Sequence, residues 1–316
     1  MTKKIFVDGA AGTTGLEIRE RLANRRDLSL VQLGDAARKD SRARAGALND
    51  ANIVILCLPD EAAREAVALI DNPAVRVIDA STAHRVAPGW VFGFPEFEPG
   101  NYDAIAAAKR VTNPGCWSTG FLALICPLIR AGLVPADAPL STHGISGYSG
   151  GGKAMIEEFE KTDSPVYVET VARAYAMQLA HKHVPEMTDR AGLRHPPVFS
   201  PYVGRFYRGM IVEVPLQLWT LPGAPKADEL HAALAEAYRG RPLVEVASLA
   251  EAAAVKSLDA EALRNTNRLK LYVFANETTG QARLSAVLDN LGKGASGAAV
   301  QNLNLMLGLP ETTGLT

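Results

Sequence analysis

The chain has 316 residues, of which 47% are hydrophobic and 21% charged, and its formal net charge is −1. This length permits two domains with separate cores, and the near-neutral charge gives no electrostatic reason to expect nucleic acid or an anionic membrane as a partner. The apolar runs are shorter than the roughly 18 residues of a membrane-spanning helix, and no signal-peptide core follows Lys3 and Lys4. We therefore expect a cytoplasmic globular protein.

The first third of the chain alternates short apolar runs with helix-like segments. Runs rich in Val, Ile and Leu predict strands, and the amphipathic or Ala-rich stretches between them predict helices. This βαβ rhythm indicates an α/β fold with a parallel sheet covered by helices. The expected strands are 5–8, 28–33, 53–58 and 75–79, and the expected helices are 14–25 and 60–70.

The pattern changes after residue 116. Alternating and β-branched stretches then predict strands at 210–219, 268–275 and 283–288, with an Ala-rich helix at 227–238. This indicates an α+β domain with a mixed or antiparallel sheet. A last helix at 296–307 ends before Gly308 and is expected to pack on the first domain. We predict one domain of residues 1–115 together with 295–316, and a second of residues 116–294.

A glycine-rich turn, Gly9-Ala10-Ala11-Gly12-Thr13-Thr14-Gly15, follows the first strand and opens the first helix. In that context glycines bring backbone N–H groups and a helix N-terminus up to a pyrophosphate. The spacing misses the G-x-G-x-x-G fingerprint by one residue, but its place in a βαβ unit favours dinucleotide binding over a tight connection without a ligand.

The residues alone leave the choice of dinucleotide open. Asp35 lies near the end of the second strand, where an acid commonly accepts the ribose 2′-OH of NAD. Arg38 and Lys39 follow and suit the 2′-phosphate of NADP.

Cys116 follows a strand-like stretch and a Pro-Gly break, and an apolar run from 121 to 129 begins a turn later. If that run is a helix, Cys116 lies at its N-terminus, where unpaired N–H groups and the helix dipole favour a thiolate. A thiolate attacks carbonyl carbon, so Cys116 is the candidate nucleophile. Cys57 and Cys126 lie in apolar runs and are interpreted as core residues. The odd cysteine count without C-x-x-C spacing is typical of a reducing compartment.

Two further motifs have competing interpretations. The segment from Gly147 to Ala154 satisfies G-x-x-x-x-G-K but has Ala where a phosphate loop needs Ser or Thr, so we expect it to line the active site instead. His181 and His183 stand at i and i+2 and would share a face of an extended segment. No third ligand has a recognisable metal spacing, so we expect no metal and favour a catalytic acid or base over surface histidines.

In order, these segments resemble the semialdehyde dehydrogenase superfamily and, within it, the shorter second type of N-acetyl-γ-glutamyl-phosphate reductase of arginine biosynthesis. The resemblance covers nearly the whole chain. It rests on VDGAAGTTGLEIRERL, ILCLPDEAAREAV, VIDASTAHR, GFPE, NPGCWSTGF, ISGYSGGGKAMI, HKHVPE and DNLGKGASGAAVQNLNLMLG. One departure is Trp117-Ser118, where Tyr-Pro is usual after the cysteine.

The resemblance implies roles for individual residues. It implies Cys116 as the nucleophile, one of His181 and His183 as the acid/base group, and NADP(H) as the cofactor, which favours Arg38 and Lys39 over Asp35. The substrate-binding residues that it implies are Arg85, Asn113, Ser146 and Glu186. The cofactor-binding residues that it implies are Gly9, Gly12, Thr13, Thr14, Gly15, Arg38, Lys39, Pro59, Gly147 and Asn290.

The implied activity is NADPH-dependent reductive dephosphorylation of N-acetyl-L-glutamyl 5-phosphate through a thioester on Cys116. A small acyl phosphate, inorganic phosphate and a second copy of the chain, in a dimer or tetramer, are the implied partners. The alternatives are an aspartate-semialdehyde dehydrogenase, a reductase of a carrier-linked aminoadipyl phosphate, a cysteine hydrolase, and a dinucleotide sensor without catalysis. The hydrolase leaves the glycine turn without a role, and the sensor would tolerate loss of Cys116.

Overall fold

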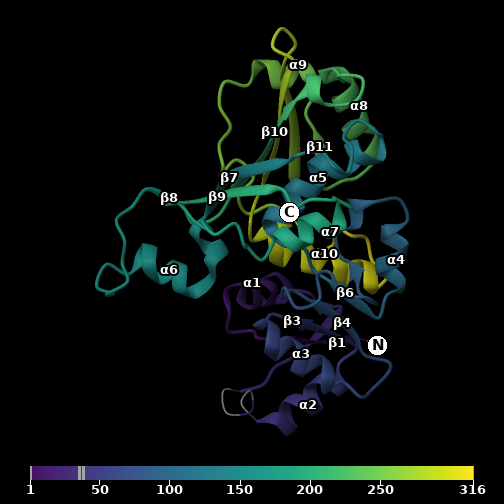
Figure 1. Cartoon of the computed structure of the whole chain (residues 1–316). Coiled ribbons are helices and arrows are strands. Elements are labelled where there is room, and N and C mark those ends of the chain that lie inside the picture. Colours follow the sequence, from purple (N-terminus) through teal and green to yellow (C-terminus); the bar gives the residue numbers. More distant parts are fainter. Residues whose placement is uncertain (1, 35–36, 38–39, 316) are drawn as a thin grey trace. The chain divides into compact units, whose positions relative to one another are not determined.

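The computed structural model describes residues 2–34, 37 and 40–315 and divides them into two compact units (Figure 1). Unit 1 contains the residues up to Pro95, Pro99–Pro114 and Ala295–Leu315. Unit 2 contains Glu96–Glu98 and Gly115–Gly294. Predicted residues Asp35, Arg38 and Lys39 lie outside the described residues.

Unit 1 is built on a six-stranded sheet with the order β2-β1-β3-β4-β6-β5, and every pair in it is parallel. Successive residues of β3 are buried in different clusters: Ile53 and Ile55 in one, Val54 and Leu56 in the other. Because successive strand side chains point to opposite faces, both faces of this sheet are covered. Its strands are β1 (Lys3–Asp8), β2 (Leu28–Val31), β3 (Ile53–Leu56), β4 (Arg76–Asp79), β5 (Val91–Phe92) and β6 (Arg110–Thr112).

Helices pack on each face of the unit 1 sheet. One cluster joins Ile18 of α1 (Thr13–Leu22), Ile105 of α4 (Asn101–Ala107) and Leu303 of α10 (Gly297–Met306). The other includes residues of α2 (Ser41–Asp50) and α3 (Asp60–Ala68). The helix nearest the C-terminus therefore completes the core of a unit that begins at the N-terminus.

Unit 2 is built on a seven-stranded mixed sheet with the order β11-β12-β13-β10-β7-β9-β8. The pairs β11–β12 and β7–β9 are parallel and the other pairs are antiparallel. Its strands are β7 (Ser141–Gly147), β8 (Ala172–Ala174), β9 (Val198–Gly204), β10 (Met210–Gln217), β11 (Val244–Val246), β12 (Leu269–Asn276) and β13 (Gln281–Leu288).

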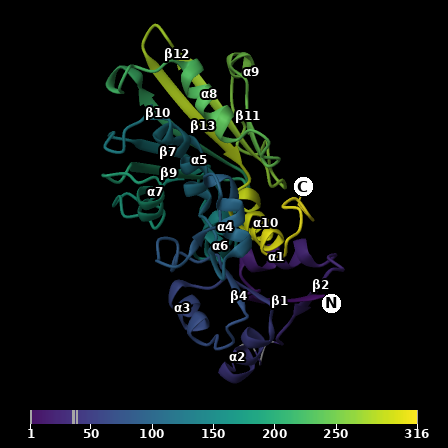
Figure 2. The same ribbon diagram turned by 90° about the vertical axis from the view of Figure 1, so that its right-hand side faces the viewer.

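The helix α5 (Cys116–Arg130) packs on β10 and β13, and α8 (Ala227–Ala237) packs on α5 and β12 (Figure 2). Gly120 of α5 makes this packing close, since a Cβ there would lie 2.6 Å from Cγ2 of Val212. Val212 thus faces α5, and its neighbours Ile211 and Glu213 face the other side of the sheet. The remaining helices of unit 2 are α6 (Gly152–Glu160), α7 (Val184–Arg190) and α9 (Leu249–Ala254).

The predicted fold class is confirmed: a parallel α/β sheet in unit 1 and a mixed sheet in unit 2. The strongly patterned segments form the expected elements. The helices α2, α4, α6, α7 and α9 and the strands β5, β7, β8, β9 and β11 were not among the expected elements, and β5, β8 and β11 have only two or three residues each.

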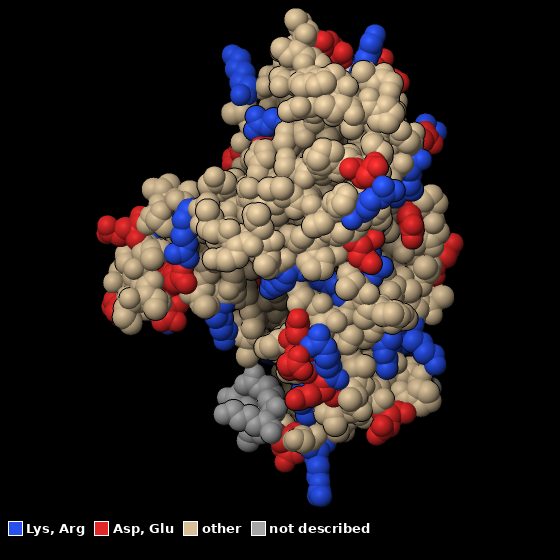
Figure 3. All heavy atoms as spheres, in the orientation of Figure 1, with Lys and Arg blue, Asp and Glu red and all other residues tan. Residues whose placement is uncertain are grey.

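The described part of the chain contains no helix that is long and apolar enough to cross a bilayer. On the face drawn in Figure 3, acidic and basic side chains are interspersed, without a broad area of one sign. This matches the near-neutral net charge of −1.

Candidate active site

Cys116 is the first residue of α5, so the helix begins where the nucleophile hypothesis requires it. The preceding Gly115 is the N-cap, no side chain caps this end, and no acid occupies the first turn. The thiol is partly exposed, although the next residues of the helix are buried. The helix therefore presents backbone N–H groups and the positive end of its dipole beside an accessible thiol.

The other two cysteines differ from Cys116 in their surroundings. Burial raises the pKa of the Cys126 thiol to about 12. Burial also raises the pKa of Cys57, and the nearby charges of Asp79 and Asp8 raise it further. Both thiols therefore stay protonated at neutral pH, as expected of core residues.

Two elements of unit 2 hold the backbone around Cys116. Oε1 of the buried Glu186, on α7, accepts a hydrogen bond from the N–H of Gly115 at 3.0 Å. On the other side Gly294 approaches so closely that a Cβ there would lie 2.6 Å from Cβ of Cys116. Glu186 thus ties α7 to the nucleophile helix, and the substrate contact predicted for it stays a prediction.

The two predicted histidines lie together in unit 2, before α7. Their ring centroids are 4.8 Å apart, and Nδ1 of His181 accepts a hydrogen bond from the backbone N–H of His183 at 3.2 Å. His183 is buried as the N-cap of α7, whereas His181 is partly exposed and packs against the rings of Tyr175 and Phe199. Which histidine transfers the proton stays open.

Trp117, the residue that departs from the family pattern, is the second residue of α5, and its side chain is buried. Its indole Nε1–H donates to the hydroxyl of Tyr175 at 2.9 Å, and its ring meets Phe199 edge-on at 5.2 Å. Sequence reasoning missed Tyr175, because no motif or spacing connects it to Cys116 across the intervening residues.

The predicted residues Ser146, Gly147 and Asn290 belong to one network in unit 2. The backbone N–H of Gly147 donates to the carbonyl of Gly209 at 2.9 Å, and the N–H of Gly209 donates to Oδ1 of Asn290 at 2.8 Å. Nδ2 of Asn290 donates to Oγ of Ser149 at 2.9 Å, and the hydroxyl of buried Ser146 donates to the Gly147 carbonyl at 3.3 Å. The loop after β7 is therefore fixed by the residues that were expected to bind ligands.

In unit 1 the glycine turn connects β1 to α1. Gly9 has φ +84°, and a Cβ there would lie 2.2 Å from the carbonyl oxygen of Cys57, so only glycine fits. A Cβ on Gly15 would lie 2.5 Å from the carbonyl oxygen of Gly9. Gly12 is the N-cap of α1, which begins with Thr13 and has no side-chain cap and no acid in its first turn. This bare N-terminus fits a pyrophosphate.

A cavity of about 50 Å³ opens beside this turn, between Gly9, Ala10 and the residues at the end of β2, from Leu30 to Leu33. In a dinucleotide-binding sheet the adenosine ribose lies at this edge. Pro59, also predicted to contact the cofactor, is the N-cap of α3. These features of unit 1 fit a dinucleotide.

Two of the predicted substrate residues, Arg85 and Asn113, lie in unit 1. Arg85 is largely buried in the segment after β4. The amide of buried Asn113 donates to the carbonyl of Ala295 at 2.9 Å and accepts from Nδ2 of Asn302 at 3.1 Å. Asn113 therefore fixes the start of α10 beside β6, and its contact with substrate stays a prediction.

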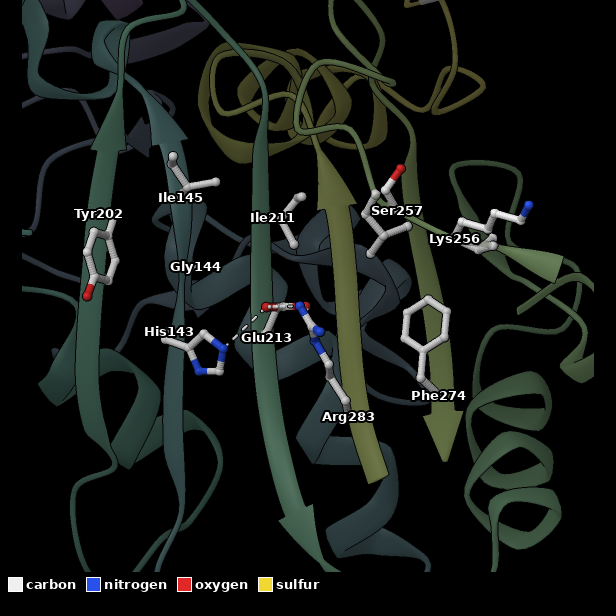
Figure 4. Close-up of a pocket in the computed structure, with 12 residues that line it drawn as sticks. His143, Gly144, Ile145, Tyr202, Ile211, Glu213, Lys256, Ser257, Phe274 and Arg283 are labelled. Atoms are coloured by element: carbon white, nitrogen blue, oxygen red, sulfur yellow. Dashed lines mark hydrogen bonds and ion pairs between the residues drawn. The ribbon is translucent and has the colours of Figure 1, made fainter. Parts of the chain in front are cut away.

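A separate cavity of about 550 Å³ lies on the face of the unit 2 sheet opposite α5 (Figure 4). There the Glu213 carboxylate lies between His143, at 3.2 Å, and Arg283, at 2.6 and 2.9 Å. Burial opposes ionisation of Glu213, but hydrogen bonds from His143, Arg283 and Ser285 outweigh it and lower its pKa to about 2. None of the predicted site residues lines this cavity.

Comparison with known proteins agrees with this architecture. Residues 4–105 match the model of the semialdehyde dehydrogenase NAD-binding domain, and residues 116–290 match that of the semialdehyde dehydrogenase dimerisation domain. The fold resembles aspartate semialdehyde dehydrogenase II of Vibrio cholerae, with a TM-score of 0.73 at 15% identity over 98% of this chain and 99% of that one.

Closer relatives are found among curated sequences. The chain is 54% identical to N-acetyl-gamma-glutamyl-phosphate reductase of Burkholderia cenocepacia over 96% of this chain and 97% of that protein. It is 50% identical to the enzyme of the same name from Trichormus variabilis over 99% of both chains. The chain therefore belongs to the semialdehyde dehydrogenase family, among the N-acetyl-gamma-glutamyl-phosphate reductases.

Proposed function

We propose that this protein catalyses the NADPH-dependent reductive dephosphorylation of N-acetyl-L-glutamyl 5-phosphate to N-acetyl-L-glutamate 5-semialdehyde, in the cytoplasm. The observation that carries the proposal is the partly exposed Cys116 at the uncapped N-terminus of α5. The close relatives that bear the reductase name support the same substrate.

The reaction begins with Cys116. Its thiolate attacks the acyl carbon, a C–S bond forms, and the C–O bond to phosphate breaks with the electron pair leaving on inorganic phosphate. NADPH, held at the glycine turn of unit 1, would supply the hydride that reduces the thioester. The hemithioacetal then releases the aldehyde as its C–S bond breaks and the electron pair returns to sulfur. The N–H groups at the start of α5 stabilise negative charge on the acyl oxygen.

The remaining site residues either transfer protons or bind the substrate. One of His181 and His183 accepts the thiol proton of Cys116 and returns a proton as the product leaves, because imidazole titrates near neutral pH. The guanidinium of Arg85 binds the phosphate or carboxylate of the substrate through paired hydrogen bonds. Asn113, Ser146 and Glu186 complete the proposed substrate contacts.

The cofactor is proposed to be NADP(H). The glycine turn with Thr13 and Thr14 would hold the pyrophosphate, and Arg38 and Lys39 would hold the 2′-phosphate. Pro59, Gly147 and Asn290 are proposed as further cofactor-binding residues, and the family resemblance puts Asn290 near the nicotinamide amide.

The test follows dinucleotide reduction in the oxidative direction with phosphate present. N-acetylglutamate semialdehyde and aspartate semialdehyde are offered separately, each with NADP⁺ or NAD⁺. We expect phosphate-dependent turnover with the acetylated substrate and NADP⁺. Turnover with aspartate semialdehyde alone would contradict the proposed substrate, and a preference for NAD⁺ would contradict the proposed cofactor. No turnover with either substrate would favour the alternatives of a cysteine hydrolase or a dinucleotide sensor.

We further propose that the protein works as a homo-oligomer through the open sheet face, defined here as Ile145, Tyr202, Ile211 and Phe274 around the His143–Glu213–Arg283 cluster. These residues line the cavity of Figure 4 on the side of the sheet that α5 does not cover. The match of residues 116–290 to a dimerisation domain supports a second copy of this chain as the occupant.

A charge placed on the open sheet face should separate the subunits. Tyr202→Glu puts a carboxylate where a half-exposed aromatic ring now lies, and we expect the mass measured by light scattering to fall to that of one chain. Val86→Glu is the control, because Val86 in unit 1 has the same exposed fraction, 45%, and should not change the mass. An unchanged mass for Tyr202→Glu would refute this surface.

A further inference from the structure

Tyr175 occupies a position that the proposed mechanism has not used. Its side chain is partly exposed in the segment between β8 and α7, and its hydroxyl accepts the indole N–H of Trp117. Its ring lies 5.7 Å from that of His181, with the two planes at 64°. Tyr175 is thus placed between the residue next to the nucleophile and the histidine pair.

The contact with Trp117 determines what the Tyr175 hydroxyl can do. An indole nitrogen donates only, so the phenol oxygen must be the acceptor and its own hydrogen points elsewhere. Among the described residues, no side chain or carbonyl accepts that hydrogen. The hydroxyl is therefore a donor that is held in place and available to a ligand.

The charge state of Tyr175 suits this role. Burial raises the pKa of its phenol, and the negative charge of nearby Cys116 raises it further, while the hydrogen bond from Trp117 opposes the change only in part. The phenol therefore keeps its proton at neutral pH. The hydrogen bond from Trp117, the residue after Cys116, places the Tyr175 hydroxyl near the start of α5.

The backbone around Tyr175 is strained. Ala176 and Leu179 both have φ +57°, a left-handed conformation that side chains with a Cβ rarely adopt. Two such residues within four positions cost stability, and strain of this kind gathers at functional sites. Here it lies along the chain between Tyr175, which accepts the Trp117 hydrogen bond, and His181.

We propose that Tyr175 is a further catalytic residue, whose hydroxyl, aligned by Trp117, donates a hydrogen bond to the acyl oxygen of the substrate held on Cys116. The donor assists the N–H groups of α5 as negative charge develops on that oxygen. This inference rests on the proposed function. In this proposal Trp117, which departs from the family pattern, is a positioning residue that aligns the Tyr175 hydroxyl.

The test compares Tyr175→Phe, Trp117→Phe and the double variant with the wild type, using N-acetylglutamate semialdehyde, phosphate and NADP⁺. Tyr175→Phe should lower kcat about 100-fold, the usual effect of losing one oxyanion donor, and leave KM within about twofold. Trp117→Phe should lower kcat by about tenfold, because the donor remains but loses its alignment. The double variant should be no slower than Tyr175→Phe, since Trp117 acts through Tyr175.

Two controls separate catalysis from folding. The rate of alkylation of Cys116 by iodoacetamide should stay within about twofold in Tyr175→Phe, because the nucleophile is intact. Tyr102→Phe, which removes a phenol that donates to Glu311 in unit 1, should not change kcat. An equal fall in kcat and in the alkylation rate of Tyr175→Phe would overturn the catalytic role of Tyr175. So would a double variant whose loss of kcat equals the product of the losses in the two single variants.

The same assay distinguishes this inference from the proposed function. An active wild type with an equally active Tyr175→Phe variant overturns the role of Tyr175 alone. An inactive wild type overturns the proposed function, and the role of Tyr175 with it.

Discussion

Replacing Cys116 with alanine should lower phosphate-dependent turnover by about 10⁴- to 10⁶-fold, the range typical for loss of a covalent nucleophile. The structure gives the reason: this thiol is partly exposed at an uncapped helix N-terminus, and no other described cysteine has that environment. The measurement is NADP⁺ reduction with N-acetylglutamate semialdehyde and phosphate. Affinity for NADP⁺, measured by calorimetry, should be unchanged, because the proposed pyrophosphate site is the glycine turn of unit 1.

The matched control is Cys126→Ala, which makes the same change in the same helix. Cys126 is buried, and its pKa is raised to about 12, so it cannot act as a nucleophile at neutral pH. Its replacement should leave turnover within about twofold and cost roughly 1 kcal/mol of stability from the small cavity. Substantial activity in Cys116→Ala would refute the thioester route and favour the alternative of a dinucleotide-binding protein that tolerates its loss.

The sequence was sufficient for features that depend on local chemistry. The glycine turn could be recognised because Gly9 has a positive φ and lies close to the carbonyl of Cys57. Both requirements restrict that position to glycine. The start of α5 at Cys116 followed from the Pro-Gly break and the apolar run after it. The parallel sheet followed from its continuous apolar strands, which only a doubly covered sheet would bury.

Features that depend on distant pairing could not be predicted. Tyr175 meets Trp117 only because the segment after β8 folds back toward α5, and no spacing in the sequence records that. Asn113 and Glu186 were assigned to the substrate by resemblance, but their side chains also bind the backbone at Ala295 and Gly115. The ion pair of Glu96 and Lys293 was missed for the same reason, because almost the whole of unit 2 separates the two residues in sequence.

Removing one partner of this ion pair should destabilise unit 2 strongly. Nζ of Lys293 lies 2.8 Å from both carboxylate oxygens of Glu96, and the two side chains are 1% and 0% exposed. Glu96→Leu leaves a buried ammonium without its counter-charge, and Lys293→Met leaves a buried carboxylate. We expect each to cost about 3–5 kcal/mol, measured by urea unfolding followed by fluorescence, because Trp117 and Trp219 report on unit 2.

The double variant separates the charges from the packing. With both charges replaced by apolar groups of similar size, no buried charge remains without a partner, so stability should return to within about 1 kcal/mol of the wild type. Glu261→Gln is the surface control: its ion pair with Arg264 is exposed, and its loss should cost less than about 1 kcal/mol. Additive losses in the double variant would mean that the pair stabilises unit 2 by shape rather than by charge compensation.

The position of the pair next to the nucleophile gives the double variant a second use. Lys293 precedes Gly294, the residue that packs against Cys116. The ion pair therefore fixes the backbone segment that contacts the nucleophile. If the pair only compensates buried charge, the stable double variant should react with iodoacetamide at Cys116 as fast as the wild type. If it also positions the nucleophile, the double variant should be stable but slow in both alkylation and turnover. The buried ion pair would then serve to orient Cys116 rather than to stabilise unit 2.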